Sequence, residues 1–256
     1  MLPPPTLPPT LVIDGLMKRY DTTVALAGID LEVPAGSCFG LVGPNGSGKT
    51  TTLRSVVGLV RPDAGRIRVL GVDAVADVLT ARTRIGAVLD PLQLFERLTA
   101  REFLQTVGEL RGLDPGLVAD RSDELFAVMQ LTPDADRQIV GYSPGMRKKT
   151  ALAAALVHRP RLLLLDEPFE GVDPVSARTM RTMLERFRSG GGTVVLSSHV
   201  MDLVERLCDH LAVIHDGRVV LTGRTDELRG GRRLEDAFID VIGEREVDED
   251  ALSWLA

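Results

Sequence analysis

Cysteine is scarce in this sequence, with Cys38 and Cys208 the only two among 256 residues. Two cysteines cannot form the disulfide framework of a small secreted domain, and neither has metal-ligand spacing to any of the four histidines. The chain is therefore expected in a reducing interior. Cys38 stands inside the apolar stretch CFGLV, where a free thiol packs as a small hydrophobic group, so we predict a core position for it.

Long hydrophobic runs and an excess of positive charge are also missing. The longest uncharged apolar run, ALAAALV at 151–157, is far shorter than the ~20 residues of a membrane-spanning helix. With 30 Lys and Arg against 36 Asp and Glu, the formal net charge is −6, which argues against a broad surface for nucleic acid or anionic lipid. Only local basic patches, such as Arg147, Lys148 and Lys149, are compatible with this charge. We expect no nucleic-acid partner.

The two ends of the chain differ in composition from its middle. Residues 1–10, MLPPPTLPPT, have neither a basic n-region nor an apolar h-region, so we predict a flexible, proline-stiffened leader and not a signal peptide. Residues 231–256 finish in the acidic stretch EREVDEDALSWLA, which predicts a loosely held tail. The folded domain is expected over residues 11–230.

The middle of the chain alternates short apolar runs with helical patterns, and its 44% hydrophobic composition can fill a large core. Several runs are apolar throughout, which predicts an α/β fold whose parallel sheet is covered on both faces. The predicted strands, of which only several are apolar throughout, are CFGLV, RIRVL, IGAVL, RLLLLD, GTVVLSS and HLAVIHD. Residues 11–42 alternate strand-like pieces with turns and predict an antiparallel layer, and HDGRVVLTG predicts a hairpin.

Strand patterns stop between Thr99 and Arg159. The segment TAREFLQTVGELRG opens with a capping box from Thr99 to Glu102, and further helical segments continue through residue 157. We therefore predict an all-helical subdomain at about 91–160, inserted into the α/β core.

Residues 43–50, GPNGSGKT, fit the phosphate-binding pattern G-x-x-x-x-G-K-[ST] between a predicted strand and a predicted helix. Its glycines let backbone N–H groups turn inward, and the helix N-terminus adds partial positive charge for phosphates. Lys49 is expected to reach the β- and γ-phosphates, and Thr50 to bind Mg²⁺. The predicted nucleotide-binding residues here are Gly43, Pro44, Asn45, Gly46, Ser47, Gly48, Lys49, Thr50 and Thr51.

Two carboxylates follow the buried strand in LLLLDEP at 162–168. In a protein with a phosphate loop, Asp166 at the strand end can hold magnesium through water, and Glu167 can orient or deprotonate the attacking water. His199 follows the strand GTVVLSS, whose C-terminal end shares the sheet edge at which the nucleotide must lie. We predict that His199 contacts the γ-phosphate.

The motifs GPNGSGKTT, GYSPGMRKK, LLLLDEPFEGVDP and LSSHV occur in an order and spacing that resembles the ATP-binding cassette (ABC) family, the nucleotide-binding subunits of ABC transporters. The resemblance covers about residues 11–230. It implies a P-loop NTPase fold with a RecA-like core, an antiparallel β layer and an all-helical subdomain. It also implies ATP hydrolysis, with ATP and Mg²⁺ as cofactors.

In that family two cassettes dimerise head to tail, and the signature turn of one, here GYSPG at 141–145, covers the γ-phosphate held by the other. The resemblance assigns this contact to Ser143 and the N–H of Gly145, aided by the positive end of the following helix. It assigns Asp173 in EGVD to the dimer interface and Tyr20 to stacking on the adenine. The second subunit is expected to be an identical chain.

The sequence departs from the family pattern at two places. The family carries a glutamine after the IGAVL strand that reaches the magnesium; Asp90 stands there instead, and its shorter, charged side chain can still bind Mg²⁺ through water. The signature has Tyr142, Pro144 and Met146 for the usual leucine, glycine and glutamine, and Pro144 suits the first turn of a helix. This signature resembles that of exporters of drugs, lipids and polysaccharides whose permease is a separate polypeptide.

These features together predict an ATPase subunit at the cytoplasmic face of the plasma membrane, bound to integral-membrane permease subunits and driving export. The permease contact is expected near residues 90–98, where Leu94, Phe95 and Leu98 stand in a loop; a small satellite core beneath that loop is the alternative. Two other functions stay open: a soluble ABC-type ATPase acting on DNA or ribosomes, and an ATP-dependent switch that hydrolyses weakly.

Overall fold

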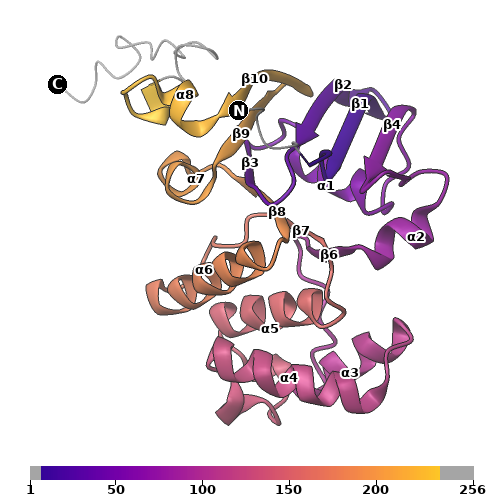
Figure 1. Cartoon of the computed structure of the whole chain (residues 1–256), viewed down its shortest axis with the longest axis vertical. Helices are drawn as coiled ribbons and strands as arrows, with labels where there is room; N and C mark the ends of the chain where they lie inside the picture. The colour runs from indigo at the N-terminus through magenta and orange to yellow at the C-terminus, as the bar shows by residue number, and fades with distance from the viewer. Residues whose placement is uncertain (1–6, 237–256) are drawn as a thin grey trace, which may run out of the picture.

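The computed structural model describes residues 7–236, which form two β-sheets and a group of helices (Figure 1). One sheet is antiparallel, with four strands in the order β2-β1-β4-β5. The strands are β1 (Leu11–Tyr20), β2 (Thr23–Val33), β4 (Ala64–Val69) and β5 (Val72–Asp73).

The second sheet has six strands in the order β10-β9-β3-β8-β7-β6, in which only β9 and β10 are antiparallel neighbours. Strands β3, β7 and β8 are buried along their whole length because layers cover both faces of this sheet. The strands are β3 (Cys38–Val42), β6 (Ile85–Val88), β7 (Leu162–Leu165), β8 (Thr193–Ser198), β9 (His210–His215) and β10 (Arg218–Arg224).

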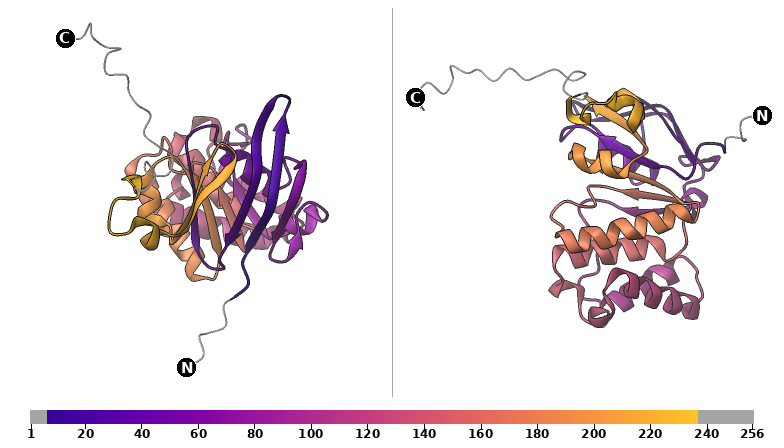
Figure 2. Two further views of the ribbon diagram at one scale, coloured as in Figure 1. Left: turned by 90° about the horizontal axis from the view of Figure 1, so that it is seen from above. Right: turned by 60° about the vertical axis from the view of Figure 1, so that its left-hand side comes forward.

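Helices lie on both sides of the six-stranded sheet (Figures 1 and 2). Helix α1 lies between the two sheets, whereas α5 packs against β6 and α6 on the other side, with α3 and α4 beyond α5. Within residues 7–236, no helix is long and apolar enough to cross a membrane. The helices are α1 (Lys49–Val56), α2 (Val78–Thr83), α3 (Ala100–Leu110), α4 (Pro115–Met129), α5 (Pro144–Leu156), α6 (Pro174–Ser189), α7 (Met201–Leu207) and α8 (Thr225–Arg229), with 3₁₀ turns at Thr132–Asp134 and Ile139–Gly141.

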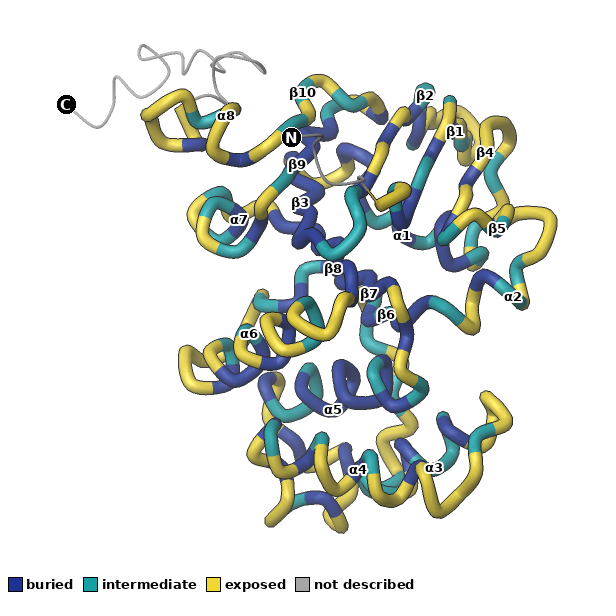
Figure 3. The backbone as a smooth tube through the Cα atoms, viewed as in Figure 1, coloured by how far each residue is buried: buried dark blue, intermediate teal, exposed yellow. Residues whose placement is uncertain are grey.

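Two hydrophobic clusters lie on opposite faces of the six-stranded sheet. One joins the antiparallel sheet and α1 to the face that carries Phe39 and Leu41. The other joins the opposite face to the helices, with Phe126 and Leu152 among its buried members. Figure 3 shows the result: buried backbone runs through the central strands and α5, while α3 and α4 expose their outer sides. The sheet edge at which the strands end is therefore rigidly supported from both faces.

The predicted α/β fold is confirmed, with one reassignment. The run RIRVL forms part of β4 in the antiparallel sheet and not part of the parallel core. The physical reason is that exposed Arg66 and Arg68 alternate with buried Ile67 and Val69, which leaves one apolar face and not two. The predicted hairpin is formed by β9 and β10.

The helical insert begins at the predicted capping box. Thr99 Oγ1 accepts a hydrogen bond from the N–H of Glu102 at 3.1 Å, and the Glu102 carboxylate accepts one from the N–H of Thr99 at 2.8 Å. These bonds satisfy backbone donors that have no partner within the helix. Helix α3 therefore starts where the sequence indicates.

Packing extends past residues 11–230 at both ends. Thr10 is buried, and its Oγ1 lies 2.9 Å from Thr193 Oγ1. Leu234 is a buried member of the hydrophobic cluster that joins the six-stranded sheet to the helices, called here the helix-side cluster. The rest of the predicted leader and tail, residues 1–6 and 237–256, lies outside the described residues.

The two cysteines lie next to each other in the core. Their Sγ atoms are 3.7 Å apart, Cys38 at the start of β3 and Cys208 directly after α7. The predicted core position of Cys38 is confirmed. The hydrogen bond to Cys38 and burial together raise the pKa of the Cys208 thiol.

Candidate nucleotide site and catalytic carboxylates

The predicted phosphate loop joins β3 to α1 and depends on glycine at two positions. Gly43 has φ +155°, and a Cβ on it would lie 2.1 Å from the carbonyl oxygen of Ile214 in β9. Gly48 has φ +114° at the N-cap of α1, where no side chain caps the helix. The loop therefore packs tightly on the sheet and leaves the first N–H groups of α1 free for an anion.

Lys49 lies inside this loop and is only 6% exposed. Its Nζ donates to the carbonyl oxygens of Gly43 at 2.7 Å and Pro44 at 3.1 Å. Burial lowers the pKa of Lys49, and the negative charges of Glu167 and Asp166 oppose that shift. The ammonium group is thus held between the loop and two carboxylates from another part of the chain.

A cavity of about 320 Å³ brings the loop together with polar residues from three other segments, and with Ala25 from β2. It lies at the C-terminal edge of the parallel strands, the ordinary position of a ligand in an open α/β sheet. Predicted site residues that do not line it are Tyr20, Gly43, Pro44, Ser143, Gly145 and Asp173. The residues that line it are Ala25, Asn45, Gly46, Ser47, Gly48, Lys49, Thr50, Thr51, Asp90, Asp166, Glu167, Glu170 and His199.

Asp166 and Glu167 are joined through a serine that the sequence analysis did not identify. Ser197, in β8, donates to Asp166 Oδ1 at 2.6 Å and accepts from the N–H of Glu167 at 2.9 Å. The signal for it was a polar pair, Ser197 and Ser198, at the end of an otherwise apolar strand. One hydroxyl therefore fixes both acidic residues relative to the neighbouring strand.

Glu167 and His199 form a pair. His199 Nδ1 lies 3.0 Å from Glu167 Oε1. The Glu167 backbone has φ +43°, a left-handed conformation that a side chain other than glycine adopts at a cost of about 1–3 kcal/mol. Such strain is retained where the surroundings hold it, and here it directs the carboxylate towards the cavity that Lys49 also lines.

The residues present fit a divalent cation. Asp166 is 3% exposed, and its Oδ2 is buried without a hydrogen-bond partner, so one oxygen of a hard carboxylate ligand is free. Thr50 and Asp90 line the same cavity. Within residues 7–236, this cavity included, no group of three or more His, Cys, Asp or Glu side chains is placed to hold a metal ion by itself, so a cation here would also need oxygen ligands from Thr50 and from the nucleotide.

The signature turn, residues 141–145, leads into α5 as expected for a helix start. The Ser143 hydroxyl accepts from the N–H of Met146 at 3.3 Å, and Pro144 occupies the first turn. Gly145 is buried, and a Cβ on it would lie 2.7 Å from Ser176 Oγ in α6. Glycine is therefore required here by the approach of α6.

The remaining predicted contacts have local partners. Asp173 caps α6 by accepting from the N–H groups of Val175 and Ser176, and hydrogen bonds from Ser176 lower the pKa of Asp173. Tyr20 ends β1 with 45% of its surface exposed, and Lys18 Nζ lies 5.5 Å from its ring centroid. Both side chains are accessible from outside the chain.

The basic patch that the net charge allowed is not formed. Lys149 is buried, Arg147 pairs with Glu96, and Lys148 points its Nζ at backbone carbonyls. Burial also lowers the pKa of Lys149. The three cations are therefore directed at groups of this chain or buried, and they do not form a basic surface.

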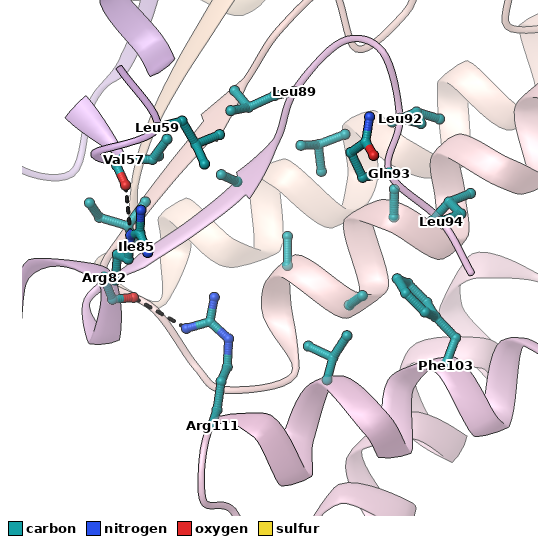
Figure 4. Close-up of a pocket in the computed structure, with 16 residues that line it drawn as sticks. Val57, Leu59, Arg82, Ile85, Leu89, Leu92, Gln93, Leu94, Phe103 and Arg111 are labelled. Atoms are coloured by element: carbon teal, nitrogen blue, oxygen red, sulfur yellow. Dashed lines mark hydrogen bonds between the residues drawn. The ribbon is translucent and has the colours of Figure 1, made fainter. Parts of the chain in front are cut away.

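A second cavity, of about 310 Å³, opens between β6, the loop at 89–94, α3 and α5 (Figure 4). Leu92 and Leu94 line it, and with Leu98 they also pack on the helix-side cluster, so this loop has the satellite core that was the alternative to a contact surface. Phe95 is different, because it is 54% exposed and meets Phe103 edge to face at 5.7 Å.

Comparison with models of known families matches residues 26–170, more than half of the chain, to the family described as ABC transporter. The chain belongs to this family. A daunorubicin/doxorubicin resistance ATP-binding protein of Streptomyces peucetius is 40% identical over 223 residues, 86% of this chain and 68% of that protein. The Nod factor export ATP-binding protein I of Ralstonia nicotianae is 37% identical over 220 residues, again 86% and 68%. The ABC transporter ATP-binding protein NatA of Bacillus subtilis is 36% identical over 213 residues, 83% and 87%.

Solved structures share the whole fold. The structure of an ATP-binding subunit of an ABC transporter superposes with a TM-score of 0.84 at 27% identity, over 91% of this chain and 99% of that one. A nucleotide-free ATP-binding cassette superposes with a TM-score of 0.77 at 23% identity, over 94% and 98%, and supports the fold alone. The predicted ABC family, P-loop NTPase fold and ATPase activity coupled to transport are confirmed.

Proposed function

We propose that two copies of this chain close head to tail on two MgATP and drive an integral-membrane permease that exports a drug-like, lipid-like or polysaccharide-like molecule. The relatives named for drug resistance and for Nod factor export support this direction of transport and this range of substrates. The work is done at the cytoplasmic face of the plasma membrane, to which the permease holds the chain. The observation that carries the proposal is the joining of the phosphate loop to the Glu167–His199 pair across one cavity.

The nucleotide is held from three sides in this proposal. Backbone N–H groups of residues 43–51 and Lys49 bind the phosphates. Tyr20 stacks on the adenine, a contact worth about 1–3 kcal/mol by analogy with base stacking in single strands. Thr50 and Asp166 hold Mg²⁺, with Asp90 as a further oxygen ligand through water. Bound Mg²⁺ supplies positive charge that offsets the charge on the phosphate oxygens.

Hydrolysis is assigned to the Glu167–His199 pair. Glu167 orients a water molecule and takes its proton while the water oxygen bonds to the γ-phosphorus, and the bond from that phosphorus to the β–γ bridging oxygen breaks. His199 is proposed to contact the γ-phosphate, and its Nδ1, 3.0 Å from Glu167 Oε1, also restrains the rotamer of the Glu167 carboxylate for proton transfer. ADP and phosphate are the products.

The second subunit supplies what one chain lacks. Ser143 and the N–H of Gly145 are proposed to contact the γ-phosphate bound by the partner, because they lie away from the cavity of their own chain at the start of a 13-residue helix. Asp173 lies beside Gly145 and is proposed to meet the partner's surface. Each site is then complete only in the dimer.

The permease is proposed to dock on the second cavity and the exposed Phe95 beside it. Most of the lining is apolar, but Arg82 and Arg111 enter at one end (Figure 4). The Arg111 guanidinium donates to the backbone carbonyl of Arg82, and the Arg82 side chain donates through Nε to the backbone carbonyl of Val57. Within residues 7–236 neither guanidinium meets a carboxylate, and burial together with Arg82 lowers the pKa of Arg111. We infer that the docking segment combines apolar side chains with an acidic residue.

The test is the substitution Glu167→Gln in the full-length chain. Because a positioned general base contributes about 10²–10⁴-fold, turnover should fall by that factor while MgATP still binds, and the dimer should persist with MgATP on size-exclusion chromatography. Unchanged ATP turnover in E167Q would show that Glu167 is not the general base. A chain that stays monomeric with MgATP would remove the head-to-tail dimer, whereas a parent chain that binds MgATP but shows no ATP turnover even with its permease would favour the weakly hydrolysing switch.

A further inference from the structure

Lys148 connects the signature helix α5 to the loop that carries Glu167. Its Nζ donates to the carbonyl oxygen of Glu167 at 2.7 Å and to that of Glu170 at 2.6 Å. Both carbonyls belong to the segment between β7 and α6, whereas Lys148 lies five residues after Ser143 at the start of α5. The contact therefore joins the two halves of the proposed site within one chain.

The chemistry of this contact is unusual for a lysine. Burial lowers the pKa of Lys148, and the charges of Glu170 and Asp90 oppose that shift. No carboxylate among the described residues lies within ion-pair distance of its ammonium group, which is directed instead at two main-chain oxygens. The half-buried Lys148 ammonium group makes charge-assisted hydrogen bonds to two carbonyls, and these bonds restrain the main chain to which the carbonyls belong.

The backbone that it fixes is the strained one. Glu167 has φ +43°, and three side chains hold it: Ser197 of β8 accepts from its N–H, His199 contacts its carboxylate, and Lys148 of α5 donates to its carbonyl. We propose that Lys148 is a positioning residue for ATP hydrolysis, which holds the Glu167 backbone in its left-handed conformation from the signature helix. This inference rests on the proposed catalytic role of Glu167.

Helix α5 links the two halves of the proposed active site. Because Lys148 and Ser143 share α5, a displacement of the signature turn also displaces the group that holds the Glu167 carbonyl. The carboxylate is then aligned for proton transfer only when α5 is in its present position relative to the loop. A misplacement of about 1 Å at such a group can cost ~10²-fold in rate.

The experiment compares Lys148→Met, Lys148→Arg and Arg147→Met in the full-length chain. Arg147 is the matched control, because it is the adjacent cation on α5 and pairs with Glu96 at the surface. We expect K148M to lower kcat by about 10–100-fold with KM for ATP within about 3-fold of the parent. K148R keeps the charge and several donors and should recover part of kcat, whereas R147M should behave as the parent.

Each result decides the matter. Parental kcat in K148M, an equal loss in R147M, or a change confined to KM overturns the inference. If K148M does not fold, Lys148→Gln keeps an amide NH₂ donor group without the charge, and it is judged by the same division between kcat and KM. E167Q separates the two proposals: low turnover in E167Q with parental K148M removes only the role of Lys148, and unchanged turnover in E167Q removes the role of Glu167 and this inference with it.

Discussion

Single polar side chains in this fold bridge elements that lie far apart in the sequence. The Ser197 hydroxyl accepts a hydrogen bond from the N–H of Glu167 and donates one to Asp166 Oδ1. A buried N–H left without an acceptor costs about 1–3 kcal/mol, so this hydroxyl holds the carboxylates in place without help from a ligand. The geometry of the site is thus largely set before the nucleotide binds.

His158 should make stability depend on pH. Burial, with the nearby charges of Arg111 and Arg121, lowers its pKa to about 4, while its Nε2 lies 3.0 Å from the carbonyl oxygen of Ile85. Between pH 6.5 and pH 4 the unfolded chain therefore binds a proton that the folded chain does not, so the free energy of unfolding falls as the pH drops through this window. From pH 7 to pH 5 the loss should be about 1–2 kcal/mol, allowing for partial solvent screening.

Denaturant unfolding at the two pH values checks this expectation. The control is His158→Gln, which keeps an N–H donor for Ile85 but has no proton to take up. The difference between pH 7 and pH 5 should be smaller in H158Q by about 1–2 kcal/mol. Equal pH dependence in the two proteins would show that His158 is not the titrating group.

At the scale of elements, the start of α5 combines helix capping with the proposed phosphate contact. Ser143 caps the helix, Pro144 fills its first turn, and Gly145 admits α6. The capping bond alone is worth about 1 kcal/mol. A loss of function on changing Ser143 could therefore come from the helix or from the phosphate, and the two must be separated.

Ser143→Asp separates them. Aspartate caps a helix as well as serine does, so the free energy of unfolding should stay within about 0.5 kcal/mol of the parent. The added negative charge opposes the γ-phosphate of the partner subunit, and loss of such a contact costs roughly 10²-fold in turnover. Steady-state ATPase assays and thermal unfolding of S143D, beside S143A, measure both quantities. Parental turnover in S143D would leave Ser143 with capping alone.

The elements were more predictable than their contacts. Apolar runs and the phosphate-loop pattern predicted the parallel sheet, α1 and the capped start of α3, because those signals are local in sequence. The antiparallel layer was expected within residues 11–42, so the position of the strand RIRVL in that sheet was not predicted, although its alternating arginines indicate one exposed face. Lys148 lies 19 residues from Glu167 along the chain and Ser197 lies 30, so no local pattern could indicate that both hold its backbone.

At the scale of the whole molecule, the helical insert contributes to both of the proposed contact surfaces, one for the partner subunit and one for the permease. The signature turn begins α5, and the apolar cavity with Arg82 and Arg111 is formed by α3, α5 and β6 (Figures 1 and 4). Helix α5 takes part in both. In the proposed assembly, a change at the nucleotide can therefore reach the permease through one helix.

Arg111→Glu tests the second surface. Reversing this charge sets a carboxylate against the acidic residue expected in the docking segment, so affinity for the permease should fall at least about 10-fold. The measurement is binding to a candidate permease subunit in detergent or vesicles, with Arg186→Glu on the exposed side of α6 as the control. Parental binding by R111E would show that the docking segment carries no acidic residue at this end.

The paired cysteines have a practical consequence for watching the subunits move. Thiol-directed labels need a thiolate that solvent can reach, whereas both native sulfurs are buried and the pKa of Cys208 is raised by its hydrogen bond to Cys38 and by burial. The folded native chain therefore serves as its own unreactive background. A single cysteine introduced on the surface of α5 would take up a spin label or fluorophore alone, and the separation of two such labels would report directly on opening and closing.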